Sequence, residues 1–223
     1  MTQPTKAVLF DLDGTFADTA PDLSYAVNQM RIARGLLPVA DAVTRPYTSS
    51  GARGLLGAGF GITPDHADYP AMRDEFLNLY EANLCRETRL FDGMAELIDA
   101  LESRGLTWGI VTNKAERFAL PLMKLLGYGA RAACVIGGDT TGKMKPHPEP
   151  LYAAARAIHI DPAACLYVGD DERDIHAGRA AGMKTIAVRY GYLNGSDPAA
   201  WGADVVIEVP LDLLPLLTPA RPV

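Results

Sequence analysis

The chain has 223 residues, 48% of them hydrophobic and 22% charged, a composition typical of folded globular proteins that argues against long disordered regions. That length suits one large domain, or a main domain with a smaller one inserted. The formal net charge of −6 argues against nucleic acid and anionic membranes as partners, while leaving room for a local basic pocket that binds a phosphate.

The cysteines and the N-terminus indicate the compartment. Cys85, Cys134 and Cys165 are far apart and form no CxxC pair, so buried reduced thiols are expected rather than disulfides or a thiolate metal site. The first apolar run ends at Asp11 without a preceding secretory signal, and no run approaches the roughly 20 apolar residues of a membrane span. We therefore expect a cytoplasmic protein with no membrane partner.

Short apolar runs that end in polar or glycine-rich turns predict the strands. Runs of about four apolar residues, many of them β-branched, suit strands that are buried on both faces. In chain order they are Ala7–Phe10, Trp108–Val111, Cys134–Ile136, Cys165–Val168 and Thr185–Val188, with Val205–Ile207 at an edge.

Helical patterns separate these strands in the second part of the chain. They cover Met94–Arg104, Arg117–Leu126, Pro150–Ile158 and Asp174–Ala181. Strands and helices alternate from Leu90 onward, which predicts an α/β fold with a Rossmann-like parallel sheet flanked by helices and joined by right-handed crossovers.

The interval from Phe16 to about Arg89 is far longer than one crossover requires. It reads as three helices, roughly 20–34, 50–60 and 71–85, separated by glycine and proline turn signals. We predict a small all-helical cap domain over residues 16–89, inserted after the first strand. Residues 1–15 and 90–223 then form the catalytic core, and the tail 218–223 is expected to be loose.

Polar side chains follow the predicted strands, at the sheet edge where ligands of open α/β sheets bind. They are Asp11, Asp13, Thr15, Thr112, Asn113, Lys145, Asp170 and Asp174. Carboxylates this close together repel one another unless a cation compensates. Oxygen ligands without a His or Cys partner favour Mg²⁺, and the added lysine favours a phosphoryl group as the ligand.

The spacing of the acidic residues supports this interpretation. Asp11 and Asp13 are two apart in an extended turn, so one carboxylate can face the metal while the other points into the cleft. Asp170 and Asp174 are four apart at the start of a predicted helix, and we expect them on one helical face.

Four motifs in order along the chain resemble the haloacid dehalogenase-like hydrolases. They are Asp11-Leu12-Asp13-Gly14-Thr15, Thr112-Asn113, Lys145-Pro146 and Gly169-Asp170-Asp171 followed by Asp174. The resemblance covers essentially the whole chain. Phe16 stands where leucine is usual, and we expect a difference in packing only.

Local stretches narrow the resemblance within that family. Asp18–Asp22 and Val111–Lys114 look like the phosphoglycolate phosphatase group. Further stretches look most like its N-acetylmuramic acid 6-phosphate phosphatase branch; they are Leu90–Met94, Arg117–Ala119, Tyr190–Tyr192 and Trp201–Val206.

The resemblance implies a mechanism through an aspartyl-phosphate. Asp11 attacks phosphorus, and Asp13 protonates the leaving oxygen and then takes a proton from the hydrolytic water. Mg²⁺ is held by the Asp11 side chain, the Asp13 backbone carbonyl and Asp170, with Asp174 close by.

Other residues are expected to bind the substrate. Thr112 and Lys145 would bind the phosphoryl oxygens; the further substrate-binding candidates are Thr15, Asn113, Arg53 and Lys114. Arg53, in the predicted cap, could pair with a substrate carboxylate. The alternative for Arg53 is an exposed arginine at a helix start.

One segment resembles a nucleotide-binding phosphate loop without matching it. Gly137–Met144 nearly fits the phosphate loop of nucleotide hydrolases, but Met144 stands where that loop needs a hydroxyl. The prolines that follow it also prevent a helix from starting at once.

These observations predict an Mg²⁺-dependent phosphatase that acts on a small carboxylated phosphate ester. N-acetylmuramic acid 6-phosphate, which implies peptidoglycan recycling, is the first candidate, and 2-phosphoglycolate is its rival. A phosphomutase of the β-phosphoglucomutase kind, a dehalogenase and a non-catalytic phosphate-ester-binding protein are the less favoured alternatives. Both a monomer and a homodimer are compatible with the sequence.

Overall fold

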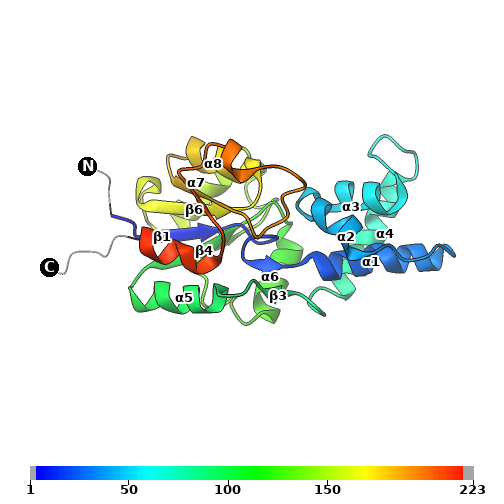
Figure 1. Cartoon of the computed structure of the whole chain (residues 1–223), viewed down its shortest axis with the longest axis horizontal. Helices are drawn as coiled ribbons and strands as arrows, with labels where there is room; N and C mark the ends of the chain where they lie inside the picture. The colour runs from blue at the N-terminus through cyan, green and yellow to red at the C-terminus, as the bar shows by residue number, and fades with distance from the viewer. Residues whose placement is uncertain (1–3, 218–223) are drawn as a thin grey trace.

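The computed structural model describes residues 4–217 and contains a six-stranded parallel sheet, in the left half of Figure 1. The strands are β1 (Ala7–Phe10), β4 (Thr107–Val111), β5 (Val135–Ile136), β6 (Cys165–Gly169), β7 (Lys184–Val188) and β8 (Val205–Ile207), in the order β5-β4-β1-β6-β7-β8. The six predicted strands and the α/β fold class are confirmed. The predicted loose tail, 218–223, and the first three residues of the predicted core lie outside the described residues.

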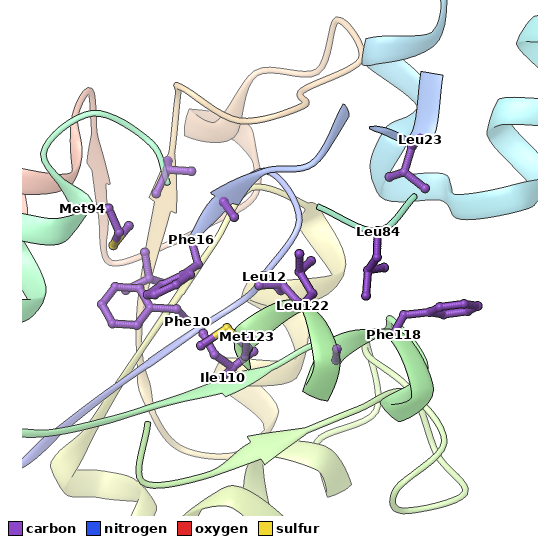
Figure 2. Close-up of a cluster of buried hydrophobic side chains, with 14 of the residues drawn as sticks. Phe10, Leu12, Phe16, Leu23, Leu84, Met94, Ile110, Phe118, Leu122 and Met123 are labelled. Atoms are coloured by element: carbon purple, nitrogen blue, oxygen red, sulfur yellow. The ribbon is translucent and has the colours of Figure 1, made fainter. Parts of the chain in front are cut away.

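Helices cover both faces of this sheet because alternate strand residues point to opposite sides. The helices are α5 (Met94–Ser103), α6 (Glu116–Leu125), α7 (Glu149–Ala157) and α8 (Glu172–Ala180), with short 3-10 turns η2 (Pro162–Ala164), η3 (Pro198–Ala200) and η4 (Pro210–Leu216). Val8 and Phe10 of β1 belong to the core with α5 and α6, whereas Ala7 and Leu9 belong to the core with α7 and α8. Part of the core that packs against α5 and α6 is drawn in Figure 2.

A group of helices lies beyond the carboxyl end of β1, at the right of Figure 1. It consists of α1 (Ala20–Ala33), α2 (Asp41–Thr44), the 3-10 helix η1 (Arg45–Ser50), α3 (Gly51–Phe60) and α4 (Tyr69–Ala82), and these helices pack on one another. Three of the helices were predicted, within a few residues. The short α2 and η1 were not, because four to six residues are too few to show a helical period. Within residues 4–217, no helix combines the length and hydrophobicity that crossing a bilayer requires.

Two short strands connect this helical group to the sheet. β2 (Ala17–Asp18) and β3 (Arg89–Leu90) pair antiparallel, and neither was predicted, since two residues carry no alternation. The fully buried carboxylate of Asp22, in the first turn of α1, reinforces the connection: it accepts hydrogen bonds from the backbone N–H groups of 86–88 and from the Thr88 hydroxyl. The two segments through which the chain passes between the sheet and the helical group, β2 and β3, are therefore held in a defined position.

Phe16 takes a packing role, as expected. It is fully buried and lies beside Phe10 (Figure 2). Its ring stacks on Trp108, with centroids 5.6 Å apart, and meets the Tyr128 ring edge-on. Phe16 therefore adds to the aromatic cluster that packs next to the turn carrying Asp11 and Asp13.

Candidate active site

Three carboxylates meet at the carboxyl ends of the central strands. Asp11 follows β1 and Asp170 follows β6, and these two strands are neighbours in the sheet. Ligand oxygens of Asp11, Asp170 and Asp174 all lie within 4.8 Å of one another, and all three residues are buried. The structure thus brings together the acidic residues that the sequence placed at the strand ends.

Asp170 is fixed by contacts from several segments. Its carboxylate accepts hydrogen bonds from the Thr15 hydroxyl (3.1 Å), the Tyr192 backbone N–H (2.8 Å) and the Ser49 hydroxyl of the helical group (3.2 Å). A Cβ atom at Gly14 would overlap the Asp170 carboxylate, so only glycine fits there. Thr15 is fully buried and donates to Asp170; it supports the acidic cluster here, whereas the sequence pointed to substrate binding.

Asp174 reaches the cluster from the first turn of α8. Asp171 caps this helix and Asp170 precedes it, so the expectation that Asp170 and Asp174 share a helical face is wrong. The reason is that the strand runs on to Gly169 and the N-cap is Asp171, which leaves Asp170 between the strand and the helix. One Asp174 oxygen accepts from the Asp171 backbone N–H at 3.2 Å, and the other lies 2.7 Å from the Lys145 ammonium. Asp174 therefore both caps the helix and faces the site.

The electrostatics of the cluster favour a cation. Burial raises the pKa of Asp170 well above its ordinary value, and the charges of Asp11 and Asp174 raise it further. Burial also raises the pKa of Asp174, to about 7, although the Lys145 ammonium opposes this shift. Buried carboxylates that resist ionisation next to one another are stabilised when a divalent ion shares their charge. These oxygen donors, without a His or Cys among them, fit Mg²⁺.

Lys145 is the buried cation of the site. Its ammonium donates to Asp11 (2.7 Å), to the Val111 carbonyl (3.0 Å) and to the Tyr167 hydroxyl (2.8 Å). Burial alone would lower the pKa of Lys145, but the carboxylates of Asp11 and Asp174 outweigh it and raise the pKa, so the side chain stays charged.

Asn113 fixes the segment that carries Lys145. Its side-chain amide donates to the Lys145 carbonyl (3.0 Å) and accepts from the Lys145 N–H (2.9 Å). A positioning role is therefore visible for Asn113, beside the substrate contact expected from the sequence. Thr112, next to it, is 2% exposed, and its hydroxyl accepts a hydrogen bond from the Lys114 N–H at 3.1 Å.

The Asp13 carboxylate is separate from the three-carboxylate cluster. The Lys114 ammonium donates to both of its oxygens, at 2.8 and 3.1 Å, and the Thr19 hydroxyl donates to one of them. The same ammonium lies 4.6 Å from the ring centroid of Tyr80, on α4. Lys114, a predicted substrate contact, is thus bound to Asp13 here; sequence spacing offered no signal for this pair or for Tyr80.

A pocket of about 680 Å³ joins this region to the helical group. We call its two parts the strand-end half (Asp11, Asp13, Thr112, Asn113, Lys145 and Asp174) and the helical half (Thr48, Arg53, Arg73, Leu77 and Tyr80). Arg53 is exposed and lines the helical half, and its pairing with a substrate carboxylate stays a prediction. Arg117, of α6, also lines the pocket and lies 4.0 Å from Glu81.

A parallel α/β sheet with a buried cluster of carboxylates, a buried lysine and a pocket at its strand ends is typical of enzymes that transfer phosphoryl groups. The chain belongs to the haloacid dehalogenase-like hydrolases, whose family pattern matches residues 8–188. The family inferred from the four motifs is thereby confirmed.

Curated relatives are similar over nearly the whole chain. A Pseudomonas aeruginosa protein named N-acetylmuramic acid 6-phosphate phosphatase is 47% identical over 95% of this chain and 94% of its own length. A Xanthomonas campestris protein named phosphoglycolate phosphatase is 48% identical over 93% of this chain and 94% of its own length. Both names describe phosphatases, which confirms the predicted type of enzyme.

The fold is also found among solved structures. A crystal structure from Haemophilus somnus, described as a predicted phosphoglycolate phosphatase, superposes with a TM-score of 0.85 and 25% identity, covering 98% of this chain and 100% of that one. The sheet flanked by helices that is described above therefore also occurs in a crystal structure.

Proposed function

We propose that this enzyme hydrolyses the phosphomonoester of N-acetylmuramic acid 6-phosphate, and that 2-phosphoglycolate is a poorer substrate. The observation that carries this choice is the length of the pocket, which continues from Lys145 at the strand ends to Arg53 and Tyr80 in the helical group. Its volume of about 680 Å³ falls in the range of sites that enclose drug-sized ligands. A two-carbon acid would fill only the strand-end half.

The residues that line the pocket support a substrate that has both polar and apolar groups. The helical half offers the Arg53 and Arg73 guanidinium groups together with apolar surface from Leu77 and the Tyr80 ring. An amino sugar that carries an acidic ether group presents hydroxyls, an amide, methyl groups and a carboxylate. These features match both kinds of lining, and the arginines suit the carboxylate.

We propose that Mg²⁺ is held by the Asp11 and Asp170 carboxylates and the Asp13 backbone carbonyl, with Asp174 adjoining. When bound, the ion neutralises the charge of the three carboxylates and of the phosphoryl oxygens. The three carboxylate side chains belong to segments whose positions the sheet and the α8 cap define.

The chain's own groups carry out the transfer. An Asp11 oxygen attacks phosphorus as the bond from phosphorus to the ester oxygen breaks, and Asp13 delivers a proton to that leaving oxygen. Water then attacks the phosphorus of the aspartyl-phosphate, Asp13 takes the proton from the water, and the Asp11 carboxylate is released with phosphate. Lys145 and Thr112 hold the phosphoryl oxygens in place throughout.

We also propose that residues 16–89 act as a cap domain on a core of residues 1–15 and 90–223. The two connecting strands, β2 and β3, support this division, because they are the covalent links between the helical group and the sheet. The Ser49 hydroxyl bond to Asp170 is a direct contact between the two parts.

The test is a side-by-side measurement of kcat/KM for the two esters with Mg²⁺, following release of inorganic phosphate. We expect a preference of about ten-fold or more for the sugar ester, because phosphoglycolate leaves the polar groups of the helical half without partners. Asp11→Asn should abolish release from both esters, whereas Asp92→Asn, at an exposed aspartate, should not. A preference for phosphoglycolate, or an isomerised sugar phosphate without phosphate release, contradicts the proposal.

A further inference from the structure

Two residues that line the pocket carry hydroxyls that differ from the other buried polar side-chain groups of the described residues. Among the buried side-chain nitrogen and oxygen atoms of residues 4–217, Thr48 Oγ1 and the Tyr80 hydroxyl are the two that lack a hydrogen-bond partner. Thr48 is 3% exposed and Tyr80 is 1% exposed. Both residues line the helical half of the pocket.

Such groups are rare because burying a polar atom without a partner costs stability. Other hydroxyls in the same helical group show the usual arrangement: Ser24 and Thr44 are buried and hydrogen-bonded to each other, and neither lines the pocket. The two exceptions therefore coincide with the pocket wall, where a bound ligand would supply the missing partners.

Thr48 lies on the wall beside the acidic cluster. It belongs to η1, and the next residue, Ser49, donates its hydroxyl to Asp170. A ligand whose phosphoryl group sits at the strand ends, and whose organic part extends into the helical half, would therefore bring that organic part to Thr48.

Tyr80 lies on the wall formed by α4. Its ring packs against Phe118, with centroids 5.6 Å apart, and beneath the Lys114 ammonium. The hydroxyl is close to that ammonium but makes no hydrogen bond of normal geometry with it. Burial raises the pKa of Tyr80 to about 12, so the phenol remains a neutral donor.

We propose that the Thr48 and Tyr80 hydroxyls bind neutral polar groups, hydroxyl or amide, of the organic part of the substrate. This inference rests on the proposed function and deepens it. The Lys114 ammonium is already bound to Asp13, and no charged side chain pairs with Thr48 among the described residues, so a neutral partner is favoured over a carboxylate. A sugar ester carries such groups, whereas phosphoglycolate has only its phosphate and its carboxylate.

The test uses Thr48→Val and Tyr80→Phe, which remove one hydroxyl each and keep the shape of the side chain. Activity is measured on N-acetylmuramic acid 6-phosphate, on glucose 6-phosphate and on phosphoglycolate. For the two sugar esters we expect kcat/KM to fall about three- to ten-fold in each variant, the usual value of a neutral hydrogen bond. Phosphoglycolate should be hydrolysed as by the wild type.

Thermal unfolding of the ligand-free protein supplies a second readout. Both variants should melt at the same temperature as the wild type or higher, because each loses a buried hydroxyl without a partner. Thr44→Val is the matched control: it removes a buried, bonded hydroxyl from the same helical group, so it should lower the melting temperature and leave all three activities unchanged.

The outcomes separate the two proposals. The wild-type preference between the sugar acid ester and phosphoglycolate tests the proposed function, while the ratio of variant to wild type on each ester tests this inference. Equal losses on all three esters, no loss on any, or no wild-type turnover of either sugar ester overturns the inference. Lower melting temperatures for Thr48→Val and Tyr80→Phe also overturn it, since they would reveal partners within the chain.

Discussion

The two halves of the pocket differ in whether their polar side chains have hydrogen-bond partners within the chain. In the strand-end half, Lys145 and Asp174 are almost fully buried, and each has partners within the chain. In the helical half, Arg53 is exposed, and the Thr48 and Tyr80 hydroxyls have no partner in the part of the chain that the structure describes. A preorganised half suits chemistry that is the same for every substrate, whereas an incomplete half suits the recognition of one particular leaving group.

The largest effect should come from the preorganised half. We expect Lys145→Met to lower kcat about 100- to 1,000-fold on every phosphate ester, because the buried ammonium next to Asp11 is lost. Lys143→Met is the control, since Lys143 is exposed two residues away, and it should be neutral. A loss confined to the sugar esters would show that Lys145 serves recognition, and the contrast between the halves would break down.

An intermediate effect should come from the incomplete half. We expect Arg53→Met to raise KM for N-acetylmuramic acid 6-phosphate about ten- to hundred-fold, the usual range for a lost charged hydrogen bond, and to change kcat little. Glucose 6-phosphate has no carboxylate and should be unaffected. Arg156→Met, on α7 where Arg156 pairs with Glu149, is the control. A fall in kcat on glucose 6-phosphate would argue that Arg53 takes part in the chemistry.

The smallest effect is a change of a few degrees in melting temperature. Burial raises the folded-state pKa of Asp170 and Asp174, the latter to about 7, while unfolded aspartate titrates near 3.9. Between these values the ligand-free folded state holds more protons than the unfolded state, so its stability falls as pH rises from about 4 to about 7.

Binding of Mg²⁺ displaces those protons, so its stabilisation should grow over the same range. We expect the melting temperature with Mg²⁺ to exceed that with EDTA by on the order of a few degrees at about pH 8, and by less at about pH 5. Asp170→Asn should remove most of this difference. An equal shift at both pH values would mean that the cluster is ionised without a cation.

Much of the fold could be predicted because it depends on local patterns. Apolar runs such as Ala7–Phe10 read as buried strands, and apolar residues at helical spacing located α1 and α5 to within a few residues. The elements that were missed, β2, β3 and η1, are short and take their conformation from their neighbours. The error at Asp170 has the same origin: whether a residue ends a strand or starts a helix depends on pairing with β1 and β7.

The sequence by itself determined the fold class and the residues at the strand ends, because strand order and parallel direction carry Asp11, Lys145 and Asp170 to one edge. The tertiary structure alone decided that Lys114 binds Asp13, and that Thr48 and Tyr80 line the pocket with hydroxyls that have no partner within residues 4–217. These arrangements depend on side-chain packing between segments far apart in the chain: Asp13 and Lys114 follow different strands, and Thr48 and Tyr80 lie on different helices. Such packing leaves no periodic trace in the sequence, because each contact depends on where two separately folded segments come to lie.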